Sequence, residues 1–129
     1  MSYATLLQLT LNRAPDDAYY FYPEFQAELR QFISLLEKEG VEVSYGEAMF
    51  DSATTVGGIV GEFVIPLAGI AGTVIGAALV AWINGRAGRK VRMKVGDIEL
   101  EASSPAEIDH LVAQALALKA QLAEQDVGR

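Results

Sequence analysis

Residues 63–85 read FVIPLAGIAGTVIGAALVAWING, and this uncharged run in the middle of the chain decides how its flanks are interpreted. As a single helix it would be about 34 Å long, enough to cross the roughly 30 Å hydrocarbon core of a bilayer. Glu62 precedes the run, and a basic stretch containing Arg86, Arg89 and Lys90 follows it. Basic residues in this position are typical of the flank of a membrane segment.

The composition of the whole chain limits the classes of partner. Hydrophobic residues make up 51% of the 129 residues, and the formal net charge is −7. An acidic chain is poorly suited to nucleic-acid phosphates, so we expect no nucleic-acid partner. The absence of cysteine excludes disulfides, thiolate catalysis and Cys-based zinc sites. The N-terminal residues lack the basic and apolar regions of a signal peptide, which favours a cytoplasmic protein, associated with the inner membrane if the apolar run contacts lipid.

The chain before the apolar run predicts a β-α-β unit. Apolar and polar side chains alternate over residues 3–11, as in a strand with one more apolar face. Apolar residues at helical spacing begin after Pro23 and end at Gly40, which is a natural helix stop. Alternation returns over residues 41–45 and predicts a second strand.

The chain after the apolar run predicts a β-hairpin over residues 91–102. A two-residue turn at Gly96-Asp97 pairs position 95 with 98, 93 with 100 and 91 with 102. This register places opposite charges across the strands, in the pairs Lys94–Glu99 and Arg92–Glu101. Charge pairs on one face and apolar pairs on the other fix the register, because a one-residue slip would reverse every side chain.

These elements together predict an α+β fold. The expected order is β-α-β, a central apolar Gly-rich helix or helical hairpin at about residues 54–85, a β-hairpin and a C-terminal helix. The last helix opens with Ser104-Pro105-Ala106-Glu107, a capping-box pattern with proline at the first helical position. We expect a single domain over residues 1–129, with helices covering a four-stranded sheet.

Three arrangements of the apolar run stay open. A buried helix would need protein on all sides, which in so small a chain favours a homo-oligomer. A membrane-spanning helix fits the length of the run, but it would place the two flanks on opposite sides of the membrane. A helical hairpin with arms at about residues 54–68 and 72–84 would return the chain to the same side.

The residues expected to meet lipid or a second copy of the chain share this segment. They are Gly61, Glu62, Phe63, Pro66, Gly69, Gly72, Gly76, Leu79 and Trp82. The spacing Gly72-x-x-x-Gly76 allows close contact between helices. In the membrane-associated arrangements, Arg86, Arg89 and Lys90 would flank the bilayer.

No group of residues with evident catalytic chemistry stands out. His110 is the only histidine, so no second His or Cys exists to build a transition-metal site around it. The glycines between residues 57 and 76 match neither dinucleotide-binding nor P-loop spacing. Asp16 and Asp17 are expected in a solvated turn. We therefore expect no enzyme activity, no catalytic residue, no cofactor and no metal.

The aromatic run Tyr19-Tyr20-Phe21-Tyr22 is the candidate partner surface. A loop cannot turn four consecutive aromatic side chains inward, so one or two of them should be exposed or cover the sheet. Tyrosine is favoured at protein interfaces, and we take Tyr19, Tyr20 and Tyr22 as the candidates. The alternative is that these rings cover the core at the start of the first helix.

Four features of residues 80–108 carry a resemblance to a known family. They are an apolar helix that ends in Val80-Ala81-Trp82-Ile83, the basic stretch Arg86–Lys90, the hairpin Val91–Glu101 and a helix that opens with Ser-Pro-Ala-Glu-Ile. This pattern resembles the bacterial "effector-associated constant component" domains of the first described type. The likeness extends over roughly residues 3–120 and is strongest in residues 80–118.

The resemblance implies a non-enzymatic module of bacterial conflict systems, including antiviral ones. Such modules recruit variable effectors, among them protease-like and nucleotide-triphosphatase-associated proteins. Two functions follow as expectations. The first is an adaptor that self-associates through its apolar helix and recruits an effector. The alternative is a membrane-inserting effector whose oligomers permeabilise the inner membrane through residues 56–84.

Overall fold

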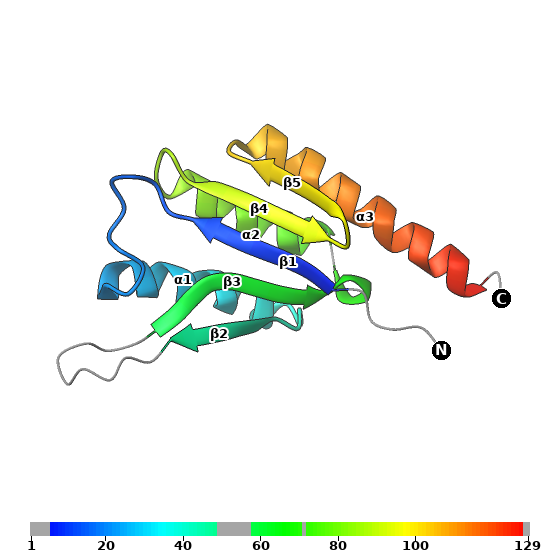
Figure 1. Ribbon diagram of the computed structural model, residues 1–129, viewed down its shortest axis with the longest axis horizontal. Helices are drawn as coiled ribbons and strands as arrows, with labels where there is room; N and C mark the ends of the chain where they lie inside the picture. Colours follow the sequence, from blue (N-terminus) through cyan, green and yellow to red (C-terminus); the bar gives the residue numbers. More distant parts are fainter. Residues whose placement is uncertain (1–5, 49–57, 71, 128–129) are drawn as a thin grey trace.

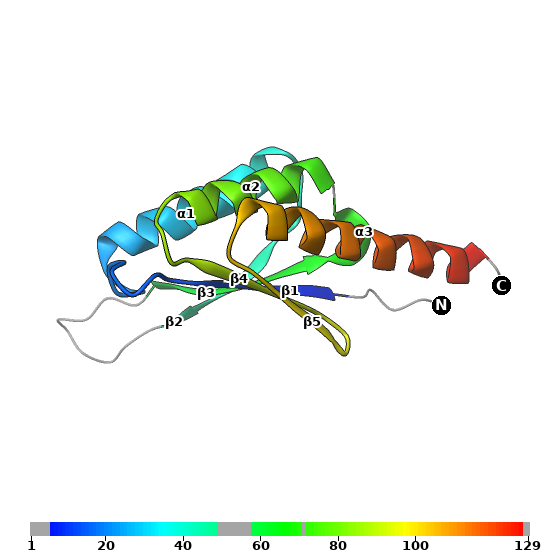
Figure 2. The same ribbon diagram turned by 90° about the horizontal axis from the view of Figure 1, so that it is seen from above.

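The structure, a computed structural model, describes residues 6–48, 58–70 and 72–127. They form two layers, in which three helices cover one face of an antiparallel sheet (Figures 1 and 2). The α+β class predicted from the sequence is confirmed. The sheet has five strands, however, where four were predicted, because part of the apolar run is a strand.

The sheet brings the two flanks of the chain together. Its strands are β1 (Leu6–Asn12), β2 (Ser44–Ala48), β3 (Gly58–Pro66), β4 (Lys90–Val95) and β5 (Ile98–Ala102). Their order is β2-β3-β1-β4-β5, so β1 lies at the centre between β3 and β4. The first flank and the hairpin therefore share one sheet, as predicted. Within the strand predicted at residues 3–11, residues 3–5 lie outside the described part of the chain.

The helix layer consists of α1 (Pro23–Lys38), α2 (Gly72–Asn84) and α3 (Pro105–Val127), with a short 3-10 turn, η1 (Leu67–Gly69), after β3. Helix α2 is in the middle, and it contacts α1 on one side and α3 on the other. The alternating buried side chains of β1 and β4 face this layer. They are Leu7, Leu9, Leu11, Val91, Met93 and Val95. The core thus lies between the sheet and the three helices.

The apolar run is neither one helix nor a pair of helices. Its first part belongs to β3, whose inward side chains Phe63 and Ile65 are fully buried, and its second part is α2. The predicted arm at residues 72–84 is confirmed, whereas the predicted arm at 54–68 is wrong from residue 58 onward, and residues 54–57 lie outside the described part. In the described residues, no helix combines the length and the apolar character needed to cross a membrane.

The hairpin register is confirmed at every predicted pair, including Arg92 opposite Glu101 and Lys94 opposite Glu99. Gly96 has a φ of +57°, which the first residue of a type II′ turn requires. Arg92 Nη2 lies 3.4 Å from Glu101 Oε2. The inter-strand charge pair at that position is therefore present on the face that points away from the helices.

The start of α3 and the end of α1 follow the sequence signals. The helix start before Pro105 is capped by Ser104, whose Oγ accepts a hydrogen bond from the Glu107 backbone N–H at 3.2 Å. Helix α1 ends in a Schellman motif, in which the N–H of Gly40 bonds the C=O of Glu37 and the following N–H bonds Leu36 at 3.0 Å. Because that motif uses residue 41, the second strand begins only at residue 44, later than predicted.

Glycines on α2 allow α3 to approach closely. A Cβ atom at Gly72 would lie 2.7 Å from Leu116 Cδ1, and one at Gly76 would lie 3.8 Å from Val112 Cγ2. The close helix contact predicted from the Gly72-x-x-x-Gly76 spacing is therefore made inside the chain. The face assigned to lipid or a second copy is covered by α3 at these two positions.

Candidate partner-binding surface

The aromatic run before α1 has two exposed and two partly buried rings. Tyr19 and Tyr22 keep 57% and 59% of their surface exposed, whereas Tyr20 and Phe21 are partly buried. The Tyr19 ring lies 6.3 Å from both the Tyr20 and the Tyr22 ring, and the Arg13 guanidinium lies 5.4 Å from its centroid. These contacts favour a defined arrangement of exposed rings. The three tyrosines predicted as a partner surface are therefore neighbours, and two are open to solvent.

Tyr20 attaches the aromatic run to the sheet. Its hydroxyl donates a hydrogen bond to the C=O of Leu11 at 3.3 Å and accepts one from the N–H of Arg13 at 3.5 Å. Its ring packs edge-on against Phe25, with the ring centroids 5.0 Å apart. A Cβ atom at Gly61 would lie 3.1 Å from Tyr20 Cε1, so glycine at this point of β3 makes room for the ring.

A pocket of about 310 Å³ opens beside Tyr20. Its walls come from β1, the aromatic run and β3, and are formed by Thr10, Asn12, Tyr20, Phe21, Val60, Gly61 and Glu62. Most of the lining is apolar, and Glu62 supplies an exposed carboxylate. The volume is at the lower end of the range for small-molecule sites.

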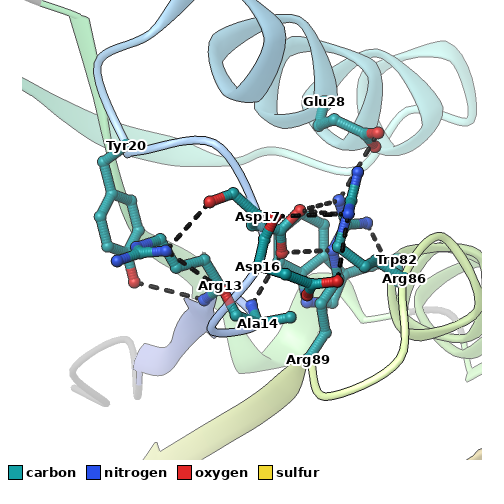
Figure 3. A network of polar contacts seen from close by, with 9 residues as sticks. All are labelled: Arg13, Ala14, Asp16, Asp17, Tyr20, Glu28, Trp82, Arg86 and Arg89. Carbon is teal, nitrogen blue, oxygen red and sulfur yellow. Dashed lines mark hydrogen bonds and ion pairs between the residues drawn. The ribbon is translucent and has the colours of Figure 1, made fainter.

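A buried ion pair holds the loop that leads into the aromatic run. The Asp17 carboxylate accepts hydrogen bonds from Arg89 Nε at 3.0 Å and Arg89 Nη2 at 2.9 Å, and from the Ala14 N–H at 2.7 Å (Figure 3). Arg86 Nε lies 3.0 Å from the same carboxylate. The side chains of Asp17 and Arg89 are only 4% and 2% exposed. Such a bidentate arginine–carboxylate pair is among the strongest charge-assisted contacts in proteins.

Arg89 also closes the end of α2. Its Nη1 donates a hydrogen bond to the C=O of Trp82 at 2.9 Å, and its guanidinium lies 4.1 Å from the centroid of the Trp82 ring. The carboxylate of Glu28 on α1 lies 3.5 Å from Arg89 Nη2, so the guanidinium contacts Asp17, Trp82 and Glu28 (Figure 3). One side chain thus joins the loop before the aromatic run, the end of α2 and helix α1.

Burial and pairing act in opposite directions on this ion pair. Burial by itself would raise the pKa of the Asp17 carboxyl, because it disfavours the charged form. Hydrogen bonds from Arg89 and from the Ala14 N–H, with the charges of Arg89 and Arg86, outweigh burial and hold the Asp17 pKa below its usual value. Burial would likewise lower the pKa of Arg89, but Asp17 and Glu28 raise it. Both groups are therefore charged at neutral pH.

The membrane-flanking role predicted for Arg89 is wrong for this structure. A guanidinium that is 2% exposed and bound to Asp17 is not accessible to a lipid headgroup. Its charge tolerates burial because the carboxylate compensates it. The same pair shows that Asp17 is not in the solvated turn that was expected. Arg86 and Lys90 are exposed, and they lie within 3.3 Å of Asp16 and 3.7 Å of Glu101 respectively, so their predicted role stays a prediction.

The residues predicted as one oligomer or membrane segment do not share a surface. The inward-facing members in β3 and α2 are buried or covered by neighbouring elements. They are Gly61, Phe63, Gly72, Gly76, Leu79 and Trp82. Glu62 and Gly69 are exposed at separate places, and Pro66 is partly buried at the end of β3. In this structure, nothing brings these residues together as a single face for lipid or a second copy.

Gln26 is a structural residue that sequence reasoning missed. Its buried side-chain amide acts as a short strand neighbour for β3: Oε1 accepts from the N–H of Ile59 at 2.7 Å, and Nε2 donates to its C=O at 3.0 Å. Nε2 also donates to the C=O of Tyr20 at 2.7 Å. Position 26 is three residues before the buried Leu29 of α1, so the helical spacing was a signal that this polar side chain points inward.

Within the described parts of the chain, no three His, Cys, Asp or Glu side chains are placed to hold a metal ion. His110 is exposed on α3. The absence of metal, cofactor and catalytic residues therefore stays a prediction. Comparison with protein-family models, with curated proteins and with solved structures gave no match.

Proposed function

We propose that this chain is a non-enzymatic adaptor that binds a partner protein through Tyr19, Tyr22 and the pocket beside Tyr20. The observation that carries the proposal is the pair of exposed tyrosines held next to a buried ion pair. Exposed aromatic side chains in a fixed arrangement bind at a low entropy cost, because fewer rotamers are lost on association. Asp17 lies two residues before Tyr19, and its buried ion pair with Arg89 holds the start of the aromatic run in place.

The resemblance to effector-associated constant component domains supports the class of partner. On that basis the partner is an effector of a bacterial conflict system, such as a protease or a nucleotide-triphosphatase-associated protein. Self-association remains part of the proposal, but with a different surface from the one first expected. The outward side of α2 offers the exposed Thr73, Ala77 and Ala81, beside a groove shared with α3.

The alternative of a membrane-inserting effector has a structural cost. Insertion of residues 56–84 would remove β3 from its place between β1 and β2 and would take the fully buried Phe63 out of the core, where its ring packs against Phe32. We rank it second for that reason. Leakage of dye from vesicles of anionic lipid on addition of the purified protein would favour this alternative over the adaptor.

The adaptor function is tested with the protein products of adjacent genes as probes. Each is mixed with the purified chain, and complex formation is measured by size-exclusion chromatography with light scattering and by calorimetry. We expect the double variant Tyr19→Ser and Tyr22→Ser to weaken a complex at least tenfold. Tyr45→Ser is the matched control, because Tyr45 is also exposed, on the edge strand β2. Equal affinity for both variants would contradict the proposal.

A further inference from the structure

Strand β5 leaves one edge of the sheet open. In the strand order β2-β3-β1-β4-β5 it is the last strand, and no other described strand pairs with its outer side. In a two-residue hairpin the pair next to the turn, Val95 and Ile98, exchanges both backbone hydrogen bonds, and such pairs then alternate along the strands. The N–H and C=O groups of Glu99 and Glu101 therefore point away from β4.

These outward backbone groups have no hydrogen-bond partner within the part of the chain that the structure describes. The opposite edge of the sheet is different. Strand β2 has an irregular register between Tyr45 and Glu47, which interrupts the row of backbone groups that a further strand would need. The outer edge of β5 is regular over its whole length. Of the two edges, that of β5 is the suitable template for an added strand.

A groove runs beside this edge. It has a volume of about 220 Å³, and its lining residues come from β5 and the first turns of α3: Leu100, Glu101, Ala106, Glu107, His110 and Leu111. Figures 1 and 2 show β5 and α3 side by side over this stretch. Leu100 faces the helix layer and Glu101 the open face of the sheet. An added strand would therefore place alternate side chains in the groove and on the open face.

We propose that the outer edge of β5 and this groove bind an extended peptide segment of a partner by strand addition, with basic and apolar residues alternating. The charges favour a basic segment. Residues 97–109 carry no Lys or Arg and five carboxylates: Asp97, Glu99, Glu101, Glu107 and Asp109. Of these, Glu101 already contacts Lys90 and Arg92 of β4, whereas no Lys or Arg lies within 4.0 Å of Glu99 among the described residues. Basic side chains opposite Glu99 and Glu101 would lie on the open face, and an apolar side chain opposite Leu100 would enter the groove.

A second copy of this chain is a poorer occupant of the same edge. Two β5 strands paired antiparallel through their outward groups, with Leu100 opposite Leu100, would place Glu99 of one copy directly opposite Glu101 of the other, twice at each interface. Like charges directly across a strand pair are destabilising. The chain itself contains the better complement: β4 reads Lys-Val-Arg-Met-Lys-Val and already matches β5 across the inner edge.

The probe is therefore a fluorescent peptide with the sequence Lys-Val-Arg-Met-Lys-Val, and binding to the full chain is measured by anisotropy. We expect saturable binding that weakens at least tenfold when the basic residues are replaced by Glu. N-methylation of the third and fifth peptide residues, whose N–H groups face β5, should abolish binding. N-methylation of the second and fourth residues, which face solvent, should change it less than threefold. Absence of binding, or equal binding of both methylated peptides, would overturn the proposal.

A pair of protein variants locates the site. Ala106→Trp fills the groove and should weaken peptide binding at least tenfold, whereas Ala113→Trp, at an exposed position of α3 outside the groove, should not. The double variant Tyr19→Ser and Tyr22→Ser should bind the peptide unchanged, which separates this site from the aromatic surface. Concentration-dependent dimerisation that Ala106→Trp abolishes would overturn the peptide in favour of a second copy.

Discussion

The apolar run is divided between two different elements, the end of strand β3 and helix α2. Strand β3 ends at Pro66 and helix α2 begins at Gly72, yet one lies inside the sheet and the other in the helix layer. Both elements are apolar, but the spacing of their buried side chains differs. Residues 58–66 bury every second side chain, as a strand does. Residues 72–84 include three alanines, which favour helices, and bury side chains at helical spacing: Ile75, Ala78, Leu79, Trp82 and Ile83. Hydrophobicity determines burial here, but it does not determine which element forms.

Strand β3 and helix α2 are each bound at one end by a buried polar side chain from elsewhere in the chain. Gln26 satisfies the backbone of Ile59 at the start of β3, and Arg89 satisfies the C=O of Trp82 at the end of α2. The first is a neutral amide, and the second is a cation that needs its own counter-ion, Asp17. The strand end should therefore be insensitive to charge, and the helix end should depend on it.

The largest expected effect is at the helix end. Arg89→Met would leave Asp17 buried without its partner, and removal of one member of a buried pair costs about 3–5 kcal/mol. We expect urea unfolding to show a loss of that size. Arg92→Met is the matched control, because Arg92 and its partner Glu101 are both exposed and surface ion pairs contribute about 0–1 kcal/mol. Equal losses for the two variants would show that burial of Arg89 is unimportant.

Loss of the buried polar contact at the start of β3 should lower the stability less. Gln26→Leu keeps the shape of the buried side chain but leaves the N–H and C=O of Ile59 without their partner, a loss of about 1–3 kcal/mol. Gln31→Leu, at an exposed position of the same helix, should change the free energy of unfolding by less than about 0.5 kcal/mol. A Gln26→Leu protein as stable as the original would mean that the amide does not act as a strand neighbour.

Much of the fold could be predicted from the sequence because its signals are local. The turn at Gly96-Asp97 and the cap at Ser104 each determine an element within a few residues. Strand β3 could not be assigned in this way, because periodicity does not separate a short buried strand from a buried helix. The Asp17–Arg89 pair joins residues 72 apart in the chain, and no spacing rule connects them. The exposed tyrosines were predicted, since a loop cannot bury four consecutive aromatic side chains. The buried ion pair that holds them in place was not predicted.

Low pH should destabilise the Asp17–Arg89 contact at the end of α2 but not the Gln26 contact at the start of β3. The pKa of Asp17 is lower in the folded protein than in the unfolded chain, so the carboxylate stabilises the fold above its unfolded pKa of about 3.9. This contribution declines as the pH falls below that value and is gone once the pH is below the folded pKa. Urea unfolding between about pH 6 and pH 2 should therefore show a steeper loss for the original chain and for Gln26→Leu than for Asp17→Asn. Parallel curves for all three would contradict an acid-sensitive helix end.

The smallest expected effects come from glycines, and they should differ in sign between the two halves. A Cβ at Gly76 in α2 meets only Val112, at an ordinary 3.8 Å, so Gly76→Ala should raise stability by about 0.5–1 kcal/mol through helix propensity. A Cβ at Gly58 in β3 would lie 2.5 Å from Gln26 Oε1, so Gly58→Ala should displace the amide and lower stability. Gly69→Ala, where nothing lies within 4 Å, is the control. If thermal unfolding moved in the same direction for the first two variants, the glycine of β3 would not be required by Gln26, and the two ends would differ in charge alone.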